Sequence, residues 1–317
     1  MAKKITYRVR NWKDYNRSLI NRGNLTIWFS KDAIKSWYQK PQKSTKRGRP
    51  FIYRDIYIEL ALTLRSLFRF TLRATQGFLE GLFSLLGLKL QVPHYSRLSR
   101  RAADLNVKLI VLRKAKTTPT DLVIDSTGLK IYGEGEWKMR THGKQKRRTW
   151  RKYHVAINPN THAVIALELT EANVHDSTIL STLLSTQKKV GRVYADGAYS
   201  FKQNFDAIAR SGGTPFIPIR SGTTLVKKKP SAGEELRNKL LQDMWKAGGR
   251  SAWKKASGYH RRSLVETHMF RLKTILGGTL HGRNLLNQKV EATIMAKILN
   301  KITALGMPKT EKIYLEK

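Results

Sequence analysis

Residues 259–273, YHRRSLVETHMFRLK, hold one acidic residue inside a basic run. Wound as an α-helix at about 100° per residue, four side chains share one narrow stripe: Tyr259, Arg262, Glu266 and Lys273. The apolar side chains of the segment fall on the opposite side, so the carboxylate points away from the helix's own core face. An acid that is held rigidly among cations needs a partner, and the rest of the chain has to supply it.

The charge of the chain is its strongest compositional signal. The 317 residues include 61 Lys and Arg but only 22 Asp and Glu, a formal charge of +39. Such self-repulsion opposes a compact fold unless a polyanion relieves it, so nucleic acid is the first candidate partner and an acidic membrane surface the second. The basic residues are spread along the chain, which favours an extended polyanion lying across the fold.

Other classes of protein are excluded by composition. The chain has no cysteine, so disulfides and thiolate zinc sites are excluded and a reducing compartment is permitted. The first residues, MAKKITYRVRNW, lack the apolar core of a signal peptide. The most apolar region, residues 56–90, is interrupted by charged side chains, so we expect no membrane span.

The first third of the chain is expected to bind DNA. Residues 1–50 form an N-terminal arm that ends in a basic linker, and Lys46, Arg47 and Arg49 are either solvated or lie on a phosphate backbone or in a minor groove. Residues 51–115 have helical periodicity at 54–72 and 75–86, followed by a turn and a basic third helix. This order predicts a helix-turn-helix-like region whose last helix offers three arginines to DNA: Arg97, Arg100 and Arg101. The alternative is an ordinary three-helix bundle with a solvated basic face.

The remainder of the chain, residues 116–305, predicts a mixed α/β sheet covered by helices. Short strands are expected at 122–125, 190–196 and 214–219, and a β-hairpin at 149–157 and 163–170. Helices are expected after Asp176, at 201–212, around Glu266 and at 288–305. The polar, basic segment 221–257 resembles an insertion or a mobile loop, and 306–317 a C-terminal tail.

Three acids are candidates for one site. Asp125 and Asp196 each follow a short apolar strand, where carboxylates can converge at the edge of a sheet, and the helix of Glu266 can pack against the same edge. Close carboxylates repel one another, and hard oxygen ligands suit Mg²⁺ or Mn²⁺ rather than zinc. Two such ions would neutralise the acids and activate a water or a 3′-hydroxyl for substitution at a phosphodiester.

Each acid also has a purely structural interpretation. An aspartate after a strand is commonly a turn or cap residue, and Glu266 with Arg262 four residues earlier is typical of a surface ion pair. Four other carboxylates are rivals for the site: Glu134, Glu136, Glu168 and Asp176. The pair His175–Asp176 either orients a catalytic group or caps a helix.

Several motifs together resemble a known family. VIDSTGLK, VYADGAYS and the spacing Tyr259-x2-Arg262-x3-Glu266-x6-Lys273 resemble bacterial DDE-type insertion-sequence transposases of insertion sequence family five. The similarity extends through GEGEWK, TWRKYHVA, NVHDS and GGTL to the N-terminal segments LINRGNLTIWF and TLRATQGFLEGLFSLL. It therefore covers nearly the whole chain.

The resemblance implies a ribonuclease H-like catalytic domain preceded by a region that recognises terminal inverted repeats. Asp125, Asp196 and Glu266 match the family's three metal-binding acids, and Tyr259, Arg262 and Lys273 its companions, which contact DNA and the active site. We expect a bacterial, cytoplasmic, nucleoid-associated enzyme without a membrane partner that acts on double-stranded DNA as a homodimer or larger assembly. It would use Mg²⁺, replaceable by Mn²⁺, to cleave element ends and join the 3′-hydroxyls to target DNA.

Two other functions remain open from the sequence. One is a metal-dependent nuclease that cleaves without joining strands. The other is a DNA-binding regulator without catalytic activity, although acids at all three positions argue against it.

Overall fold

The computed structural model describes residues 4–29, 34, 37, 53–109, 119–131 and 150–315. The chain divides into two compact units, one formed by residues 1–105 and 298–317 and the other by residues 106–297. Each unit is described separately below.

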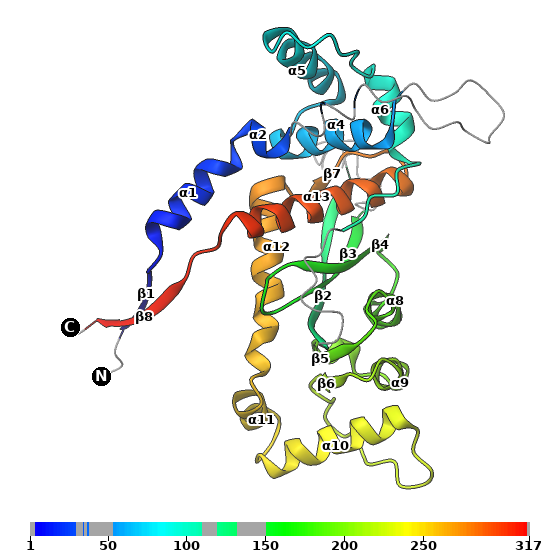
Figure 1. Cartoon of the computed structure of the whole chain (residues 1–317). Helices are drawn as coiled ribbons and strands as arrows, with labels where there is room; N and C mark the ends of the chain where they lie inside the picture. Colours follow the sequence, from blue (N-terminus) through cyan, green and yellow to red (C-terminus); the bar gives the residue numbers. More distant parts are fainter. Residues whose placement is uncertain are drawn as a thin grey trace, which may run out of the picture. The chain divides into compact units, whose positions relative to one another are not determined.

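The larger unit is built on a mixed sheet in the order β4-β3-β2-β5-β6, with β7 also paired to β2 (Figure 1). Its strands are β2 Thr120–Ile131, β3 Trp150–Ile157, β4 Val164–Glu171, β5 Val190–Tyr194, β6 Thr214–Phe216 and β7 Thr279–Leu280. β2, β3 and β4 pair antiparallel, whereas β5 and β6 continue the sheet in parallel with β2. The predicted hairpin at 149–157 and 163–170 is confirmed, and Asn158 closes its turn by accepting hydrogen bonds from two backbone N–H groups.

Helices cover both faces of this sheet. η1 Asp176–Thr178, α8 Leu180–Ser185 and α9 Lys202–Arg210 lie on one side, where α8 packs on β4 and α9 on β6. α12 Ser263–Leu276 packs on β2 and β3 on the other side. The alternation of strand side chains explains the division, because Leu122, Ile124 and Ala156 are buried in the core beneath α8 and α9. This mixed sheet flanked by helices confirms the predicted ribonuclease H-like fold class.

The segment 221–257 differs from the expected loop. It contains α10 Ala232–Lys246 and α11 Arg250–Ala256, which are followed by the 3₁₀ helix η3 Tyr259–Arg262. α10 begins with a capping box, in which Ser231 and Glu234 each bond the other's backbone N–H. The S-x-x-E spacing that specifies this start is present in the sequence, and it outweighs the polar composition that suggested a loop.

The smaller unit contains the three helices predicted for DNA binding, α4 Asp55–Phe68, α5 Leu72–Leu85 and α6 Tyr95–Ala102, and each packs against the other two. It also contains α1 Trp12–Arg22, α2 Leu25–Trp28 and a two-stranded antiparallel sheet of β1 Lys4–Val9 and β8 Thr310–Leu315. The C-terminal segment is therefore a strand partner of the N-terminus rather than a free tail. α13 Leu285–Leu305 begins in the larger unit and ends in the smaller one, so the compact units differ from the predicted boundary at residue 305.

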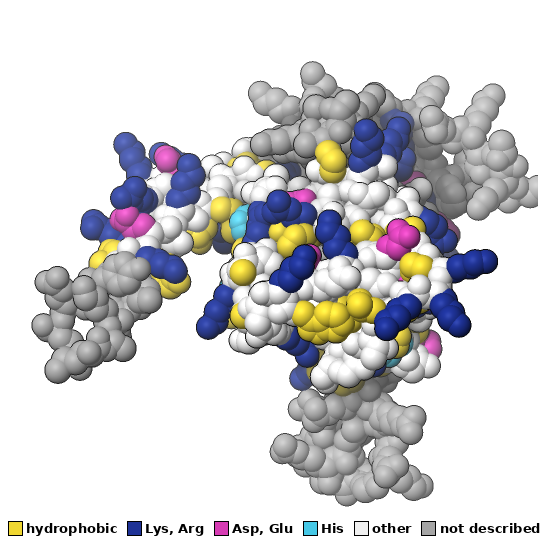
Figure 2. Space-filling view, turned by 90° about the horizontal axis from the view of Figure 1, so that it is seen from below, with side chains coloured by type: hydrophobic (Ala, Val, Ile, Leu, Met, Phe, Trp, Pro, Cys, Tyr) yellow, Lys and Arg dark blue, Asp and Glu magenta, His cyan; other side chains and the backbone are white. Residues whose placement is uncertain are grey.

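The surface shown in Figure 2 reflects the basic composition. Figure 2 shows one face of the molecule, on which Lys and Arg side chains are scattered and acidic side chains are sparse. Among the described residues, none of the helices combines the length and apolar character that crossing a bilayer requires.

Candidate active site

Asp125 in β2 lies level with Asp196, which follows the end of the neighbouring parallel strand β5. Val123 of β2 is in register with Tyr194 of β5, and each aspartate comes two residues later. Since residues two apart in a strand point to the same face, the register brings both carboxylates to one side of the sheet. Asp196 follows the end of β5. Asp125, in contrast, does not lie at the strand end where it was predicted, because β2 continues for six residues beyond it.

Local hydrogen bonds fix both aspartates. Asp125 Oδ1 accepts a bond of 2.8 Å from the backbone N–H of Ser126. Asp196 caps the 3₁₀ helix η2 Gly197–Tyr199, and its Oδ1 accepts a bond of 2.9 Å from the N–H of Ala198. One oxygen of each carboxylate is thereby oriented by the backbone.

Arg262 connects Glu266 to Asp125. Its Nη1 donates to Asp125 Oδ2 at 2.9 Å, and its Nη2 donates to Glu266 Oε1. The guanidinium therefore sits between two of the three predicted acids, with η3 and the first turn of α12 holding it there. Because Tyr259–Arg262 is a 3₁₀ helix rather than the start of the α-helix, the predicted single stripe from Tyr259 is not continuous.

Lys273 lies two turns beyond Glu266 on α12. Its Nζ donates to Thr127 Oγ1 on β2 at 2.7 Å. Thr127 is two residues from Asp125 and so lies on the same face of the strand. Its contribution was not predicted, although its position beside Asp125 in VIDSTGLK was a sufficient signal.

Tyr259 occupies a different environment from the one expected. Its side chain is buried, with 7% exposed, and packs beside Trp253 at 5.7 Å between ring centroids. The hydroxyl donates to the carbonyl of Ala195 at 3.2 Å, and burial raises the pKa of this phenol to about 12. In this structure Tyr259 anchors the start of the α12 segment to the residue before Asp196 and presents little surface to DNA.

The electrostatics of the site follow from burial and crowding. Burial raises the pKa of Asp125, and the negative charge of Asp196 adds to the rise, while the Ser126 N–H and Arg262 oppose it. Tyr199 is buried nearby, and its pKa is raised by burial and by the charges of Asp176, Asp125 and Asp196. Asp196 is thus close enough to Asp125 for its charge to raise the pKa of that carboxyl.

The rival acids have other partners. Asp176 pairs with Lys152 at 3.1 Å, and Glu168 pairs with Lys289 at 2.6 Å. Asp176 was expected to cap a helix, but the preceding His175 does so through its side chain. Glu134 and Glu136 lie outside the described residues.

The donor chemistry of the three acids fits a divalent ion. Carboxylate oxygens are hard ligands of the type that Mg²⁺ prefers. In the arrangement observed, no group of three or more His, Cys, Asp or Glu within the described ranges has the spacing of a metal site. The cation between Asp125 and Glu266 is instead the guanidinium of Arg262.

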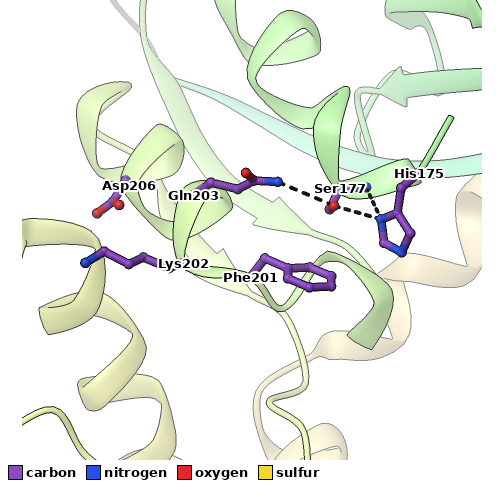
Figure 3. A pocket seen from close by; sticks show the side chains of 6 residues that line it. All are labelled: His175, Ser177, Phe201, Lys202, Gln203 and Asp206. Carbon is purple, nitrogen blue, oxygen red and sulfur yellow. Dashed lines mark hydrogen bonds between the residues drawn. The ribbon is translucent and has the colours of Figure 1, made fainter.

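A surface pocket is shown in Figure 3, and none of the three acids is among the residues that line it. It is lined by His175, Ser177, Phe201, Lys202, Gln203 and Asp206. The polar groups are mostly paired with each other or with α10, since Asp206 accepts from Ser231 and Lys202 pairs with Glu234. These contacts fasten η1, α9 and α10 together.

The arginines predicted to read DNA differ in their surroundings. Arg100 is exposed on α6, and Arg97 lies partly buried beside the ring of Tyr53. Arg101 instead donates to the carbonyl of Tyr53 and pairs with Asp55, so it ties α6 to the start of α4. Lys46, Arg47 and Arg49 lie outside the described residues.

Comparison with known proteins identifies the family. Two family models, each described as a transposase DDE domain, match residues 20–134 and 116–301. No solved structure matches the chain. The second family match spans more than half of the chain and includes Asp125, Asp196 and Glu266 together with the sheet and helix that carry them. The protein therefore belongs to the DDE transposases, a family of enzymes that act on DNA.

Proposed function

We propose that this transposase binds the terminal inverted repeats of an insertion sequence of family five, cleaves the phosphodiester bonds at both ends and joins the 3′-hydroxyls to target DNA. The observation that carries the proposal is the meeting of Asp125 and Glu266 on one guanidinium, with Asp196 level with Asp125 just beyond the end of the next strand. These acids come from three separated parts of the chain, so their proximity is a product of the fold.

Asp125, Asp196 and Glu266 are proposed to hold two Mg²⁺ ions, for which Mn²⁺ can substitute. DDE transposases use divalent metal ions, and the ions supply Lewis acidity at the reacting phosphate and lower the pKa of a bound water or hydroxyl. Burial and the charge of Asp196 raise the pKa of Asp125, and a cation bound beside this carboxyl would favour its charged form.

The basic side chains of the site serve the DNA. Arg262 and Lys273 are held at the acids by Asp125, Glu266 and Thr127, and they can turn toward the phosphates beside the scissile bond. Arg97 and Arg100 on α6 are proposed to contact the element end, as are Lys46, Arg47 and Arg49. Tyr259 is proposed to act through the position of Ala195 and Asp196. Two element ends must be handled together, so we propose a dimer or larger assembly on DNA.

The first experiment tests cleavage. Purified protein is incubated with labelled element-end DNA, with and without Mg²⁺, as wild type, Asp125→Asn and Glu266→Gln. Cleavage by the wild type should require Mg²⁺ and should fall by at least about 100-fold in both variants, while end binding without metal persists. Glu168→Gln is a matched control, since this acid lies on the same sheet and pairs with Lys289. Unchanged cleavage by Asp125→Asn would refute the assignment.

A second assay separates transposition from simple hydrolysis. Pre-cleaved ends that carry 3′-hydroxyls are mixed with target plasmid, and joined products are quantified. Joining by the wild type supports a transposase, whereas cleavage of intact ends without any joining would indicate a nuclease.

A further inference from the structure

Phe270 is an exposed aromatic residue on α12, the helix that carries Glu266. Its side chain is 69% exposed, although it lies inside α12 next to buried Met269. Within the described part of the chain, no aromatic ring or cation pairs with it. The ring therefore adds nothing evident to the packing of α12 on the sheet.

The position of Phe270 relates it to the acids. Residues three or four apart share one face of an α-helix, so Phe270 shares a face with Glu266 before it and Lys273 after it. Glu266 is itself 56% exposed, and Lys273 reaches across to β2. DNA that lies over Glu266 and Lys273 would therefore come close to this ring.

The surroundings of the ring favour a nucleobase over an apolar protein surface. The neighbouring exposed side chains on α12 are polar, Ser263, Thr267 and Thr274. A hydrophobic partner would have to bury these hydroxyls and the Glu266 carboxylate along with the ring, which is unfavourable. A base has an apolar face bordered by charged phosphates, and this matches one ring set among hydroxyls and a lysine.

We propose that Phe270 stacks on an unpaired or terminal base of the element end beside the scissile phosphate, an inference that rests on the proposed function. In an intact duplex the faces of the bases are covered by their neighbours. A side chain on a rigid helix reaches a base face only where stacking is interrupted, as at a cleaved end. Phe270 should therefore favour the cleaved or locally opened end over the paired duplex.

The test measures binding in EDTA, so that no strand is cut. Two end duplexes are compared, one with a single-nucleotide overhang at the cleavage position and one with an abasic site there. The wild type should bind the base-bearing end about tenfold more tightly, the difference expected from one stacked base. Phe270→Ala should lose this preference, and Phe270→Trp should keep it. An overhanging 2-aminopurine should be quenched by the wild type and by Phe270→Trp but not by Phe270→Ala.

Leu286→Ala is the matched control, because Leu286 is another exposed apolar residue of the same unit, on α13. It should behave like the wild type, and thermal melting should show that all variants fold. A preference that survives in Phe270→Ala, or one that the wild type lacks, overturns the stacking role.

Cleavage with Mg²⁺ is scored separately, so the two proposals can fail independently. A wild type that never cleaves but shows a Phe270-dependent preference defeats the proposed function and leaves the stacking role standing. A wild type that cleaves and joins DNA but shows no such preference defeats the stacking role and leaves the proposed function standing.

Discussion

Arg262 has a double role at the scale of single residues. Its guanidinium compensates Asp125 and Glu266 in the chain without metal, and the charges of Asp125, Tyr259 and Glu266 raise its pKa against the opposing effect of burial. The same cation competes with any ion that binds these carboxylates. The guanidinium thus offsets the charge of two of the three acids, and we propose that it lowers their affinity for a metal ion.

Replacing Arg262 should reveal this competition. In Arg262→Gln the affinity for Mn²⁺ without DNA should rise by about tenfold, as expected when a charged hydrogen bond no longer has to be displaced. Cleavage should fall because a phosphate-binding cation is lost. Calorimetric titration with Mn²⁺ measures the first effect, and Arg261→Gln is the control, since Arg261 bonds Asn160 instead. Weaker Mn²⁺ binding by Arg262→Gln would show that Arg262 organises the acids rather than competing for them.

His268 should make stability depend on pH. Burial lowers the pKa of this imidazole from 6.5 to about 4, with a further contribution from Arg271, and its Nε2 lies 3.3 Å from the Tyr153 hydroxyl. Between these two values the unfolded chain binds a proton that the folded chain excludes. Stability is therefore lost as pH falls through this window, by up to about 3 kcal/mol.

Urea unfolding at about pH 7 and about pH 5, which lie above and below the ordinary histidine pKa, measures this loss of unfolding free energy. His268→Leu should reduce the difference between the two pH values, whereas His260→Leu, at an exposed histidine, should retain it in full. The part that remains in His268→Leu is expected from His154 and His162, because burial lowers the pKa of these two imidazoles as well. Equal pH dependence in the wild type and His268→Leu would contradict the assignment.

At the scale of elements, close contacts fix α12 and α10. Tyr259 fastens the start of the α12 segment to Ala195, and Lys273 fastens its later turns to Thr127. α10 approaches α9 so closely that a Cβ at Gly233 would lie 2.4 Å from the backbone nitrogen of Asp206. The backbone conformation of Gly233 is an ordinary helical one that any residue adopts. Glycine is therefore required here by the close packing of the two helices.

Gly233→Ala should therefore destabilise the protein. The added methyl group meets backbone that cannot move cheaply, and overpacking of this kind costs about 1–3 kcal/mol. Gly81→Ala is the opposite case, because a Cβ there meets nothing within 4 Å and alanine favours a helix interior by about 1 kcal/mol. Thermal melts should shift down for the first variant and up for the second. A neutral Gly233→Ala would mean that α10 can withdraw from α9.

At the scale of the whole molecule, the main feature is the large positive net charge. The formal charge of +39 is distributed over both compact units, and acidic side chains are sparse on the surface shown in Figure 2. Counterions released from DNA should therefore drive much of the binding.

Binding to duplex DNA should weaken by about a thousandfold or more between about 50 and 200 mM salt. Arg100→Gln should lower the salt slope by about one, as for one lost phosphate contact. Arg101→Gln should destabilise the fold instead, because Arg101 holds Asp55 and Tyr53. Fluorescence anisotropy over a salt series measures the slopes, and a flat response would rule out the polyanion interpretation.

The sequence by itself determined the family and many of the elements. Local patterns sufficed for the β3–β4 hairpin, for α9 and α13, and for the three helices α4 to α6, because alternation, helical periodicity and turn residues act over short distances. The motifs around Asp125, Asp196 and Glu266 pointed to a DDE transposase, which the family matches confirm. The helices of segment 221–257 were missed because polar composition was given more weight than the Ser231–Glu234 capping signal.

Only the tertiary structure decided what each side chain of the site does. The sequence placed Tyr259 beside Arg262 on an exposed stripe, but the 3₁₀ start of the segment and the packing of Trp253 bury the ring and direct its hydroxyl to Ala195. The sequence likewise could not show that Arg262 bridges Asp125 and Glu266, or that β8 returns to pair with β1. These facts depend on contacts between residues far apart in the chain, and such contacts are set by strand register and helix packing rather than by local pattern.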